Sequence, residues 1–207
     1  SNVTSIGVES MADIATDDIE TFNSPESIFT TNNPLADTGI GFQSLTNPAS
    51  RERSNTAVGT LSMAKCTGTN NTAIGAAALY KSGGNGNVAV GDLALSSNTI
   101  GDANVAIGSQ ALKHNTGGQN NVAIGRAALI NNTNGTFNVA FGSESLESNT
   151  TGDNNIAIGH DAARASSPTG NLTGENNKIC MGNNNHDNFS CRVSLTVTSD
   201  KRDKTDI

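Results

Sequence analysis

The chain has 207 residues, a formal net charge of −7 and only 3% aromatic residues, with no tryptophan and one tyrosine. A sequence so poor in large apolar side chains is ill suited to a thick globular core, whereas a solenoid or fibre buries only a few small side chains per coil. The negative charge and the absence of clustered lysine and arginine argue against a nucleic-acid partner.

The chain also lacks the marks of membrane insertion. No apolar run approaches the roughly 20 residues of a membrane-spanning helix, and the opening residues SNVTSIGVES lack the charged and then apolar pattern of a signal peptide. Cys66, Cys180 and Cys191 are odd in number and have no C-x-x-C spacing, so they indicate neither a disulfide framework nor a zinc site. Small buried thiols are the favoured interpretation.

Residues 1–36 are predicted to hold one degenerate repeat, beginning near Ser5, and an acidic irregular segment. That segment runs from Ala12 to Leu35 and carries two prolines. Its acidic residues Asp17, Asp18 and Glu20 are interpreted as a solvated loop, because no pair of carboxylates recurs at a spacing that indicates glycoside cleavage.

Residues 37–182 carry a tandem repeat of about 17 residues, G-x-x-N-x-A-[VI]-G-x-x-[AS]-L. Seven clear copies each have an asparagine four residues before an anchor glycine, and the anchors lie 16 or 17 residues apart. Both residue types tolerate positive φ and are predicted to turn the chain. These pairs are Asn55 and Gly59, Asn71 and Gly75, Asn87 and Gly91, Asn104 and Gly108, Asn121 and Gly125, Asn138 and Gly142, and Asn155 and Gly159.

The three residues between asparagine and anchor, such as Val122–Ala123–Ile124, alternate large, small and large, as expected of a strand. We expect the Val and Ile side chains to fill a thin interior and the alanine side to let a neighbouring surface approach closely. The Ala-Leu pair after each anchor is predicted to form a second short strand with its own inward side chain. The turn asparagines are expected to form hydrogen-bonded ladders between coils.

Two all-β architectures fit such coils: a monomeric parallel β-helix, and an elongated parallel β-roll that forms a homotrimeric fibre. A left-handed hexapeptide helix would need coil lengths in multiples of six. The trimer is favoured because packing alanine-rich faces of three chains about a common axis adds burial, at about 25 cal/mol per Å², to a meagre core.

The end of the repeat region offers few candidate sites. Lys178–Gly182 is predicted as a final copy after an insertion at 164–177, and 183–198 as a capping segment. The three histidines, His114, His160 and His186, are interpreted as isolated surface residues. Asp153 and the run 83–87 resemble parts of a calcium site, but ordinary turn chemistry is favoured. No cofactor and no metal are expected.

The N-x-A-[VI]-G copies, as in Asn121–Gly125, resemble the head repeats of trimeric autotransporter adhesins, which are left-handed parallel β-rolls. Those repeats are shorter and lack the regular Ala-Leu pair, and the longer form here is more similar to repeats in phage tail fibres. This resemblance covers about residues 37–182.

Residues 199–207, SDKRDKTDI, resemble the start of the S74-type intramolecular chaperone domain found at the C-terminus of phage tail spikes and fibres. In that family the domain drives trimerisation and then cuts itself off within a Ser-Asp pair. The resemblance implies a scissile bond between Ser199 and Asp200, with Ser199 as nucleophile and Lys204 as its activator. Nearly all of such a domain would lie beyond Ile207, so this chain is not expected to cleave itself.

These resemblances imply an extracellular tail-fibre segment of a virion, without enzymatic activity of its own apart from self-cleavage. Its expected partners are two further copies of the chain, other tail proteins, and a glycan or protein receptor on the host cell. The receptor-binding residues are unknown, and the off-pattern segments Ala12–Leu35 and Arg164–Asn188 are the candidate contact regions. Two alternatives stay open: a bacterial surface adhesin of the trimeric autotransporter type, and a polysaccharide-degrading tail spike.

Overall fold

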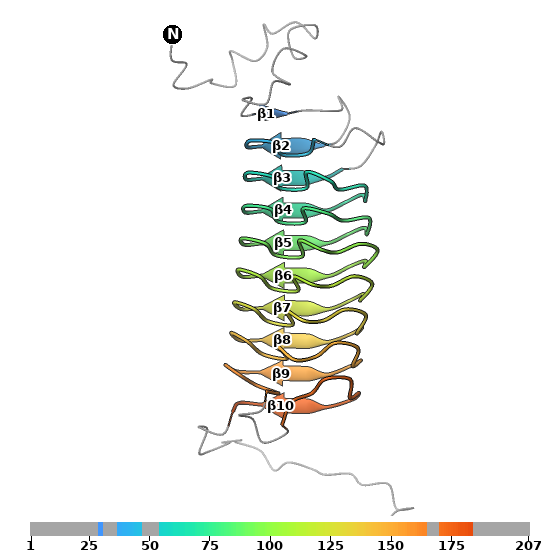
Figure 1. Cartoon of the computed structure of the whole chain (residues 1–207), viewed down its shortest axis with the longest axis vertical. Helices are drawn as coiled ribbons and strands as arrows, with labels where there is room; N and C mark the ends of the chain where they lie inside the picture. The colour runs from blue at the N-terminus through green and yellow to red at the C-terminus, as the bar shows by residue number, and fades with distance from the viewer. Residues whose placement is uncertain (1–28, 31–36, 47–53, 165–169, 184–207) are drawn as a thin grey trace, which may run out of the picture.

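The computed structural model describes residues 29–30, 37–46, 54–164 and 170–183. In these ranges the protein is all β, with no helix and hence no candidate membrane span. Ten short strands stack along the long axis as one sheet in chain order (Figure 1). They are β1 (Phe29–Thr30), β2 (Thr38–Ile40), β3 (Thr56–Val58), β4 (Thr72–Ile74), β5 (Val88–Val90), β6 (Val105–Ile107), β7 (Val122–Ile124), β8 (Val139–Phe141), β9 (Ile156–Ile158) and β10 (Ile179–Met181).

Strands β2 to β10 are parallel and in register, so that equivalent residues of successive repeats lie beside one another. Ala106 of β6, for example, pairs with Ala123 of β7. Each repeat is therefore one coil of a β-solenoid, and each coil contacts the coil before it and the coil after it. The coil between β9 and β10 is longer than the others, since Ile156 pairs with Ile179.

Strand β1 differs from the rest because it pairs with β2 in the antiparallel direction. It lies within Ala12–Leu35, which the sequence predicts to be irregular, and that prediction is wrong for these two residues. The degenerate copy near Ser5 and the segments 184–198 and 199–207 lie outside the described residues.

The direction of the strand side chains is the reverse of the prediction. The central alanines of β3 to β9 are fully buried, whereas the flanking Val and Ile side chains point outward and are half-buried or exposed, as with Ile107 at 39% and Ile158 at 42%. Alanine therefore faces the interior, and the large aliphatic residues line what we call the outer strand face, formed by the first and third residues of β2 to β10.

The return segment, defined as the eight residues from the anchor glycine onward, is not a second strand. In residues 91–98 the N–H groups of Ala94, Ser96 and Asn98 donate to carbonyls three residues back at 3.2–3.3 Å, as in consecutive turns. The intervening N–H groups reach neighbouring coils: Leu93 donates to Ala76 at 2.9 Å and Leu95 to Ala111 at 3.0 Å. The prediction of a second strand in each repeat is therefore wrong.

Positive φ angles explain why this segment turns rather than extends. The third and fifth residues of each return segment have φ between 48° and 64°, and the fifth is leucine in most coils, as at Leu95. That conformation costs a residue with a Cβ roughly 1–2 kcal/mol. Full burial of a leucine side chain returns about 1.5–3 kcal/mol, and this leucine is fully buried.

The core is thus a single thin layer between the strands and the return segments. The strands contribute one alanine per coil, and the return segments contribute a buried Ala or Ser and a large apolar residue. These large residues form one column through the stack: Leu45, Met63, Leu79, Leu95, Leu112, Leu129 and Leu146. Ser62 links the two walls directly, because its hydroxyl donates to the Ala73 carbonyl of β4 at 3.3 Å.

Candidate functional site

The residues named for self-cleavage, Ser199, Asp200 and Lys204, lie outside the described residues. Of the two candidate receptor-contact segments, only residues 29–30, 164 and 170–183 are described. The features that the structure does describe belong to the solenoid itself. They are its buried polar ladders, its charged surface and its outer strand face.

The seven turn asparagines form a buried ladder that runs through the stack. The backbone N–H of each donates to the side-chain Oδ1 of its counterpart in the preceding coil, at 2.8–3.0 Å from Asn71 to Asn155. Each Nδ2 donates to a carbonyl in the next coil, as Asn104 does to Gly118 at 2.9 Å. Asp37 accepts from Asn55 at the N-terminal end and Lys178 donates to Asn155 at the other. The expected asparagine ladder is present.

The structure contains a second buried ladder, which the sequence pattern does not reveal. It consists of the asparagines seven residues after four successive anchor glycines, whose side-chain amides bond to one another at 2.8–2.9 Å, namely Asn98, Asn115, Asn132 and Asn149. The same position holds Cys66 and Ser82 in earlier coils, and this change of residue type hides the column in the sequence. The ladder ends at Asn149, whose buried Oδ1 has no hydrogen-bond partner.

Asp153 takes part in the turn between two coils. Its Oδ1 accepts the backbone N–H of Thr136 at 2.7 Å and the hydroxyl of the same residue at 3.0 Å. Asp102 accepts from Asn85 in the same manner, with a distance of 2.7 Å from the backbone nitrogen. Within the described ranges, no group of three or more His, Cys, Asp or Glu side chains is arranged to hold a metal ion. Both carboxylates serve to fix one coil against the next.

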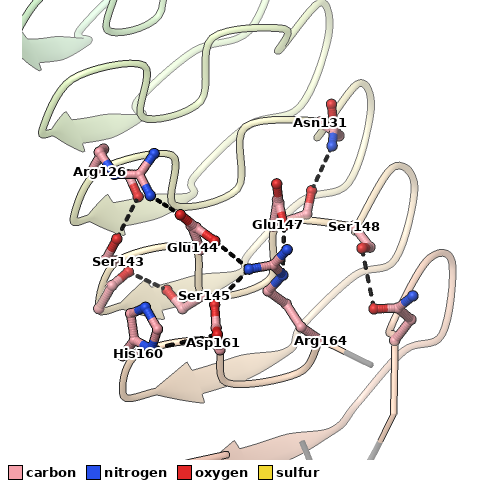
Figure 2. A network of polar contacts seen from close by, with 12 residues as sticks. Arg126, Asn131, Ser143, Glu144, Ser145, Glu147, Ser148, His160, Asp161 and Arg164 are labelled. Carbon is pink, nitrogen blue, oxygen red and sulfur yellow. Dashed lines mark hydrogen bonds and ion pairs between the residues drawn. The ribbon is translucent and has the colours of Figure 1, made fainter. Parts of the chain in front are cut away.

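The structure brings together a charged cluster near the C-terminal end of the stack (Figure 2). Arg164 contacts three carboxylates, those of Glu144, Glu147 at 2.6 Å and Asp161 at 2.6 Å. Arg126 also pairs with Glu144. His160 is not isolated as expected, since its Nδ1 lies 3.5 Å from Asp161. These residues come from three successive return segments, so the cluster ties coils together.

Glu175 caps the long coil before β10. One of its carboxylate oxygens accepts the backbone N–H groups of Thr173 at 2.6 Å and Gly174 at 3.0 Å. Hydrogen bonds from the Gly174, Glu175 and Thr173 backbone lower the pKa of this carboxyl below its usual value, with a smaller contribution from Lys178. The ionised form thus stabilises the turn.

The outer strand face exposes a series of apolar side chains along the described solenoid. Besides its half-buried valines, it includes side chains that are 39–67% exposed, namely Ile74, Ile107, Phe141, Ile158, Ile179 and Met181. With a strand spacing of about 4.8 Å, the nine parallel strands extend this face over roughly 40 Å. Contiguous exposed apolar surface of this kind marks an interaction site.

Comparison with known protein families, with curated proteins and with solved structures finds no match for the chain.

Proposed function

We propose that the chain is the shaft of a homotrimeric phage tail fibre that attaches the virion to its host cell. The outer strand face carries this proposal. It offers a straight row of apolar side chains along the solenoid, and in an isolated chain that row would stay in contact with water.

The regular spacing of the strands allows identical copies of the chain to pack against one another through this face. Parallel chains arranged about a common axis bring the same strand of each copy to the same height, so valine meets valine and isoleucine meets isoleucine in every coil. The thin internal layer, with one large residue per coil, then gains a second apolar layer at about 25 cal/mol per Å² buried. The faces proposed to pack are therefore those of Val and Ile, in place of the alanine faces expected from the sequence.

The resemblance of residues 37–182 to phage-fibre and adhesin-head repeats favours three chains over two. The resemblance of residues 199–207 to an S74-type chaperone supports a phage origin, assisted trimerisation and later self-cleavage. A trimer would present three equivalent surfaces, so that weak contacts to a host glycan or protein add through avidity.

The oligomeric state is tested by light scattering on the purified chain. We expect three times the chain mass of 21.1 kDa. Ile107→Glu, which places a carboxylate in the outer strand face, should shift the mass towards that of one chain. Gln119→Glu adds the same charge at an exposed position outside the strands and should leave the mass unchanged. A monomeric wild-type chain would contradict the trimer.

Self-cleavage is tested by expressing the gene with its complete C-terminus. The proposal expects cleavage between Ser199 and Asp200 in the wild type and none in Ser199→Ala. Mass spectrometry of the products identifies the bond. A single uncleaved product from both genes would refute self-cleavage, although the trimeric shaft would not depend on it.

A further inference from the structure

Three lysines of this acidic chain lie together on the outer side of the return segments. Lys65, Lys81 and Lys113 come from the return segments that follow β3, β4 and β6. Lys65 and Lys81 occupy equivalent positions of adjacent coils, and Lys113 lies two coils further on, one residue earlier in its return segment. The backbone hydrogen bonds show this arrangement: Lys65 donates to the Tyr80 carbonyl at 2.8 Å, Lys81 to that of Ser96 at 3.1 Å, and Ser97 to that of Lys113 at 3.2 Å. We call Lys65, Tyr80, Lys81, Lys113 and His114 the basic edge.

The basic edge lacks the carboxylates that neutralise other cations of the same wall. The return segments 59–66, 75–82, 91–98 and 108–115 contain a single acidic residue, Asp92, against three lysines, which leaves a charge of +2 with histidine neutral. Among the residues that the structure describes, none of these lysines forms an ion pair. Arg164, in contrast, occupies the position equivalent to Lys113 and contacts three carboxylates.

Burial and accessibility also distinguish this edge. Lys65, Lys81 and His114 are exposed, and Lys113 and Tyr80 are half-buried. The Lys65 Nζ lies 5.2 Å from the centre of the Tyr80 ring, which places a cation beside the only tyrosine of the chain. The edge belongs to the wall opposite the strands, so packing of copies through the outer strand face leaves it open to solvent.

We propose that the basic edge binds an acidic polysaccharide that runs along the fibre axis. Lys65 and Lys113 are three coils apart, which corresponds to about 14 Å at the usual spacing of coils. Exposed ion pairs are individually weak, so an isolated small anion would dissociate readily. A polymer with regularly repeated carboxylates or sulfates contacts the three ammonium groups at once, and the same edge recurs on each copy of a trimer.

The chemistry of the edge favours a glycan over a nucleic acid. The Tyr80 ring gives a sugar an apolar surface beside a charged group. The net charge of −7 disfavours any polyanion that extends beyond this edge, and it disfavours a phosphate backbone, with one charge per nucleotide, more than a glycan whose charges are widely spaced. This inference rests on the proposed attachment function and gives its receptor a chemical class.

Binding is measured by biolayer interferometry against polygalacturonate, dextran sulfate, neutral dextran and single-stranded poly(dT), at low and at physiological salt. We expect the wild type to bind at least one of the two acidic polysaccharides, more weakly as salt increases, and to ignore neutral dextran. The triple variant Lys65→Gln, Lys81→Gln and Lys113→Gln should bind at least about tenfold more weakly, because it loses three ion pairs. The corresponding triple lysine-to-arginine variant should retain binding.

The matched control is Gln119→Glu, Asn120→Asp and Lys178→Gln, which changes the net charge by the same amount on exposed positions away from the basic edge. It should bind within about twofold of the wild type. Circular dichroism confirms that each variant is folded, and light scattering on the same samples reports the trimer separately.

Several results would overturn the inference. They are an absence of binding to both acidic polysaccharides, equal losses in the lysine variant and its control, or lysine-dependent binding to poly(dT) as tight as to the glycans. A chain that binds the glycan as a monomer would retain the basic edge and refute the trimer alone.

Discussion

The side-chain oxygen of Asn121 accepts the backbone N–H of Asn138, one coil further along, at 2.9 Å. The same amide donates from Nδ2 to the Gly135 carbonyl at 2.8 Å. One buried side chain thus satisfies a donor and an acceptor of the next coil's backbone. The N–H of Asn138 would otherwise lie unpaired in the protein interior, whereas the Gly135 carbonyl also accepts from Asn132 at 3.0 Å.

Asn121→Ala should therefore destabilise the solenoid by about 1–3 kcal/mol, the cost of an unsatisfied buried polar group, because it leaves the buried N–H of Asn138 without its acceptor. Urea unfolding measures the change. Asn131→Ala is the control, since that exposed residue donates a solvent-accessible hydrogen bond to Glu147, and its cost should stay below about 1 kcal/mol. Equal losses would argue against a special role of the buried ladder.

Phe137 lies at a position where most other coils use glycine or asparagine, which suit positive φ. Its φ is 58°, and the equivalent residues include Gly86, Asn120 and Asn154. Its side chain is 60% exposed, so it gains little burial in the chain to offset the backbone strain. Phe137→Asn should stabilise the protein by about 1 kcal/mol, since asparagine tolerates this conformation.

The control for that prediction is Phe137→Ala, which removes the ring but keeps a residue unsuited to positive φ. Thermal unfolding of the variants should show a higher midpoint for asparagine than for alanine. A gain of the same size with alanine would attribute the effect to loss of the exposed ring.

The anchor glycines allow the coils to approach closely. Gly125 has a φ of 136°, and a Cβ at this residue would lie 2.4 Å from the carbonyl oxygen of Gly142 in the next coil. Gly125→Ala should cost more than about 3 kcal/mol, because the neighbouring atom is backbone and both strain and overlap contribute.

Gly86→Ala separates these two contributions. Gly86 also has a positive φ, 66°, but a Cβ there would meet nothing within 4 Å. Its cost should be only the conformational penalty of about 1–2 kcal/mol. Denaturant unfolding of both variants tests the difference, and similar losses would refute the overlap argument.

Glu175 makes the long coil before β10 sensitive to acid. Because hydrogen bonds from the Gly174, Glu175 and Thr173 backbone lower its pKa in the folded state, the stabilisation is present above the pKa of the unfolded chain. It is lost as the pH falls through the lower folded value. The amide NMR signals of Thr173 and Gly174 should titrate with a midpoint below 4.5.

Glu175→Gln should abolish this titration, which assigns it to the carboxylate. A midpoint at or above 4.5 in the wild type would contradict the capping interaction. A titration that persists in the variant would assign it to another acidic group.

The sequence predicts the stack because its signal is a recurring pair at a nearly constant spacing. Asn104 and Gly108 and their counterparts define the coils, and the central alanine between them marks the strand. The turn role of Asp153 also follows from residue type. These features depend on the conformational preferences of single residues. Because the same residues recur in each copy of the repeat, the pattern is visible in the sequence.

The direction of the strand faces is not predicted from the sequence, because it depends on the distance between the two walls. The layer has room for one large side chain per coil, and the return segment supplies it, as with Leu112. Alanine then fills the strand side, and Val105 and Ile107 are directed outward. The sequence predicts the larger residues in the interior because burial normally favours large apolar side chains.

The remaining differences have equally local causes. Leucine and alanine at positive φ, as at Leu93 and Ala127, contradict ordinary propensity, so a turn was interpreted as a strand. The basic edge is not evident from the sequence, because Lys65, Lys81 and Lys113 are far apart along the chain and only the stacking of the coils places them on the same side of the solenoid.

The orientation of the strands across the long axis has a mechanical consequence. A pull along that axis would load the hydrogen bonds between coils one level at a time, so a single solenoid could open at its weakest level. Chains held side by side through their outer strand faces would share that load at every level. A force that opens one chain between two coils would also have to break the contacts of that chain with its neighbours. Lateral association would thus give the fibre a tensile strength that no number of added coils could provide.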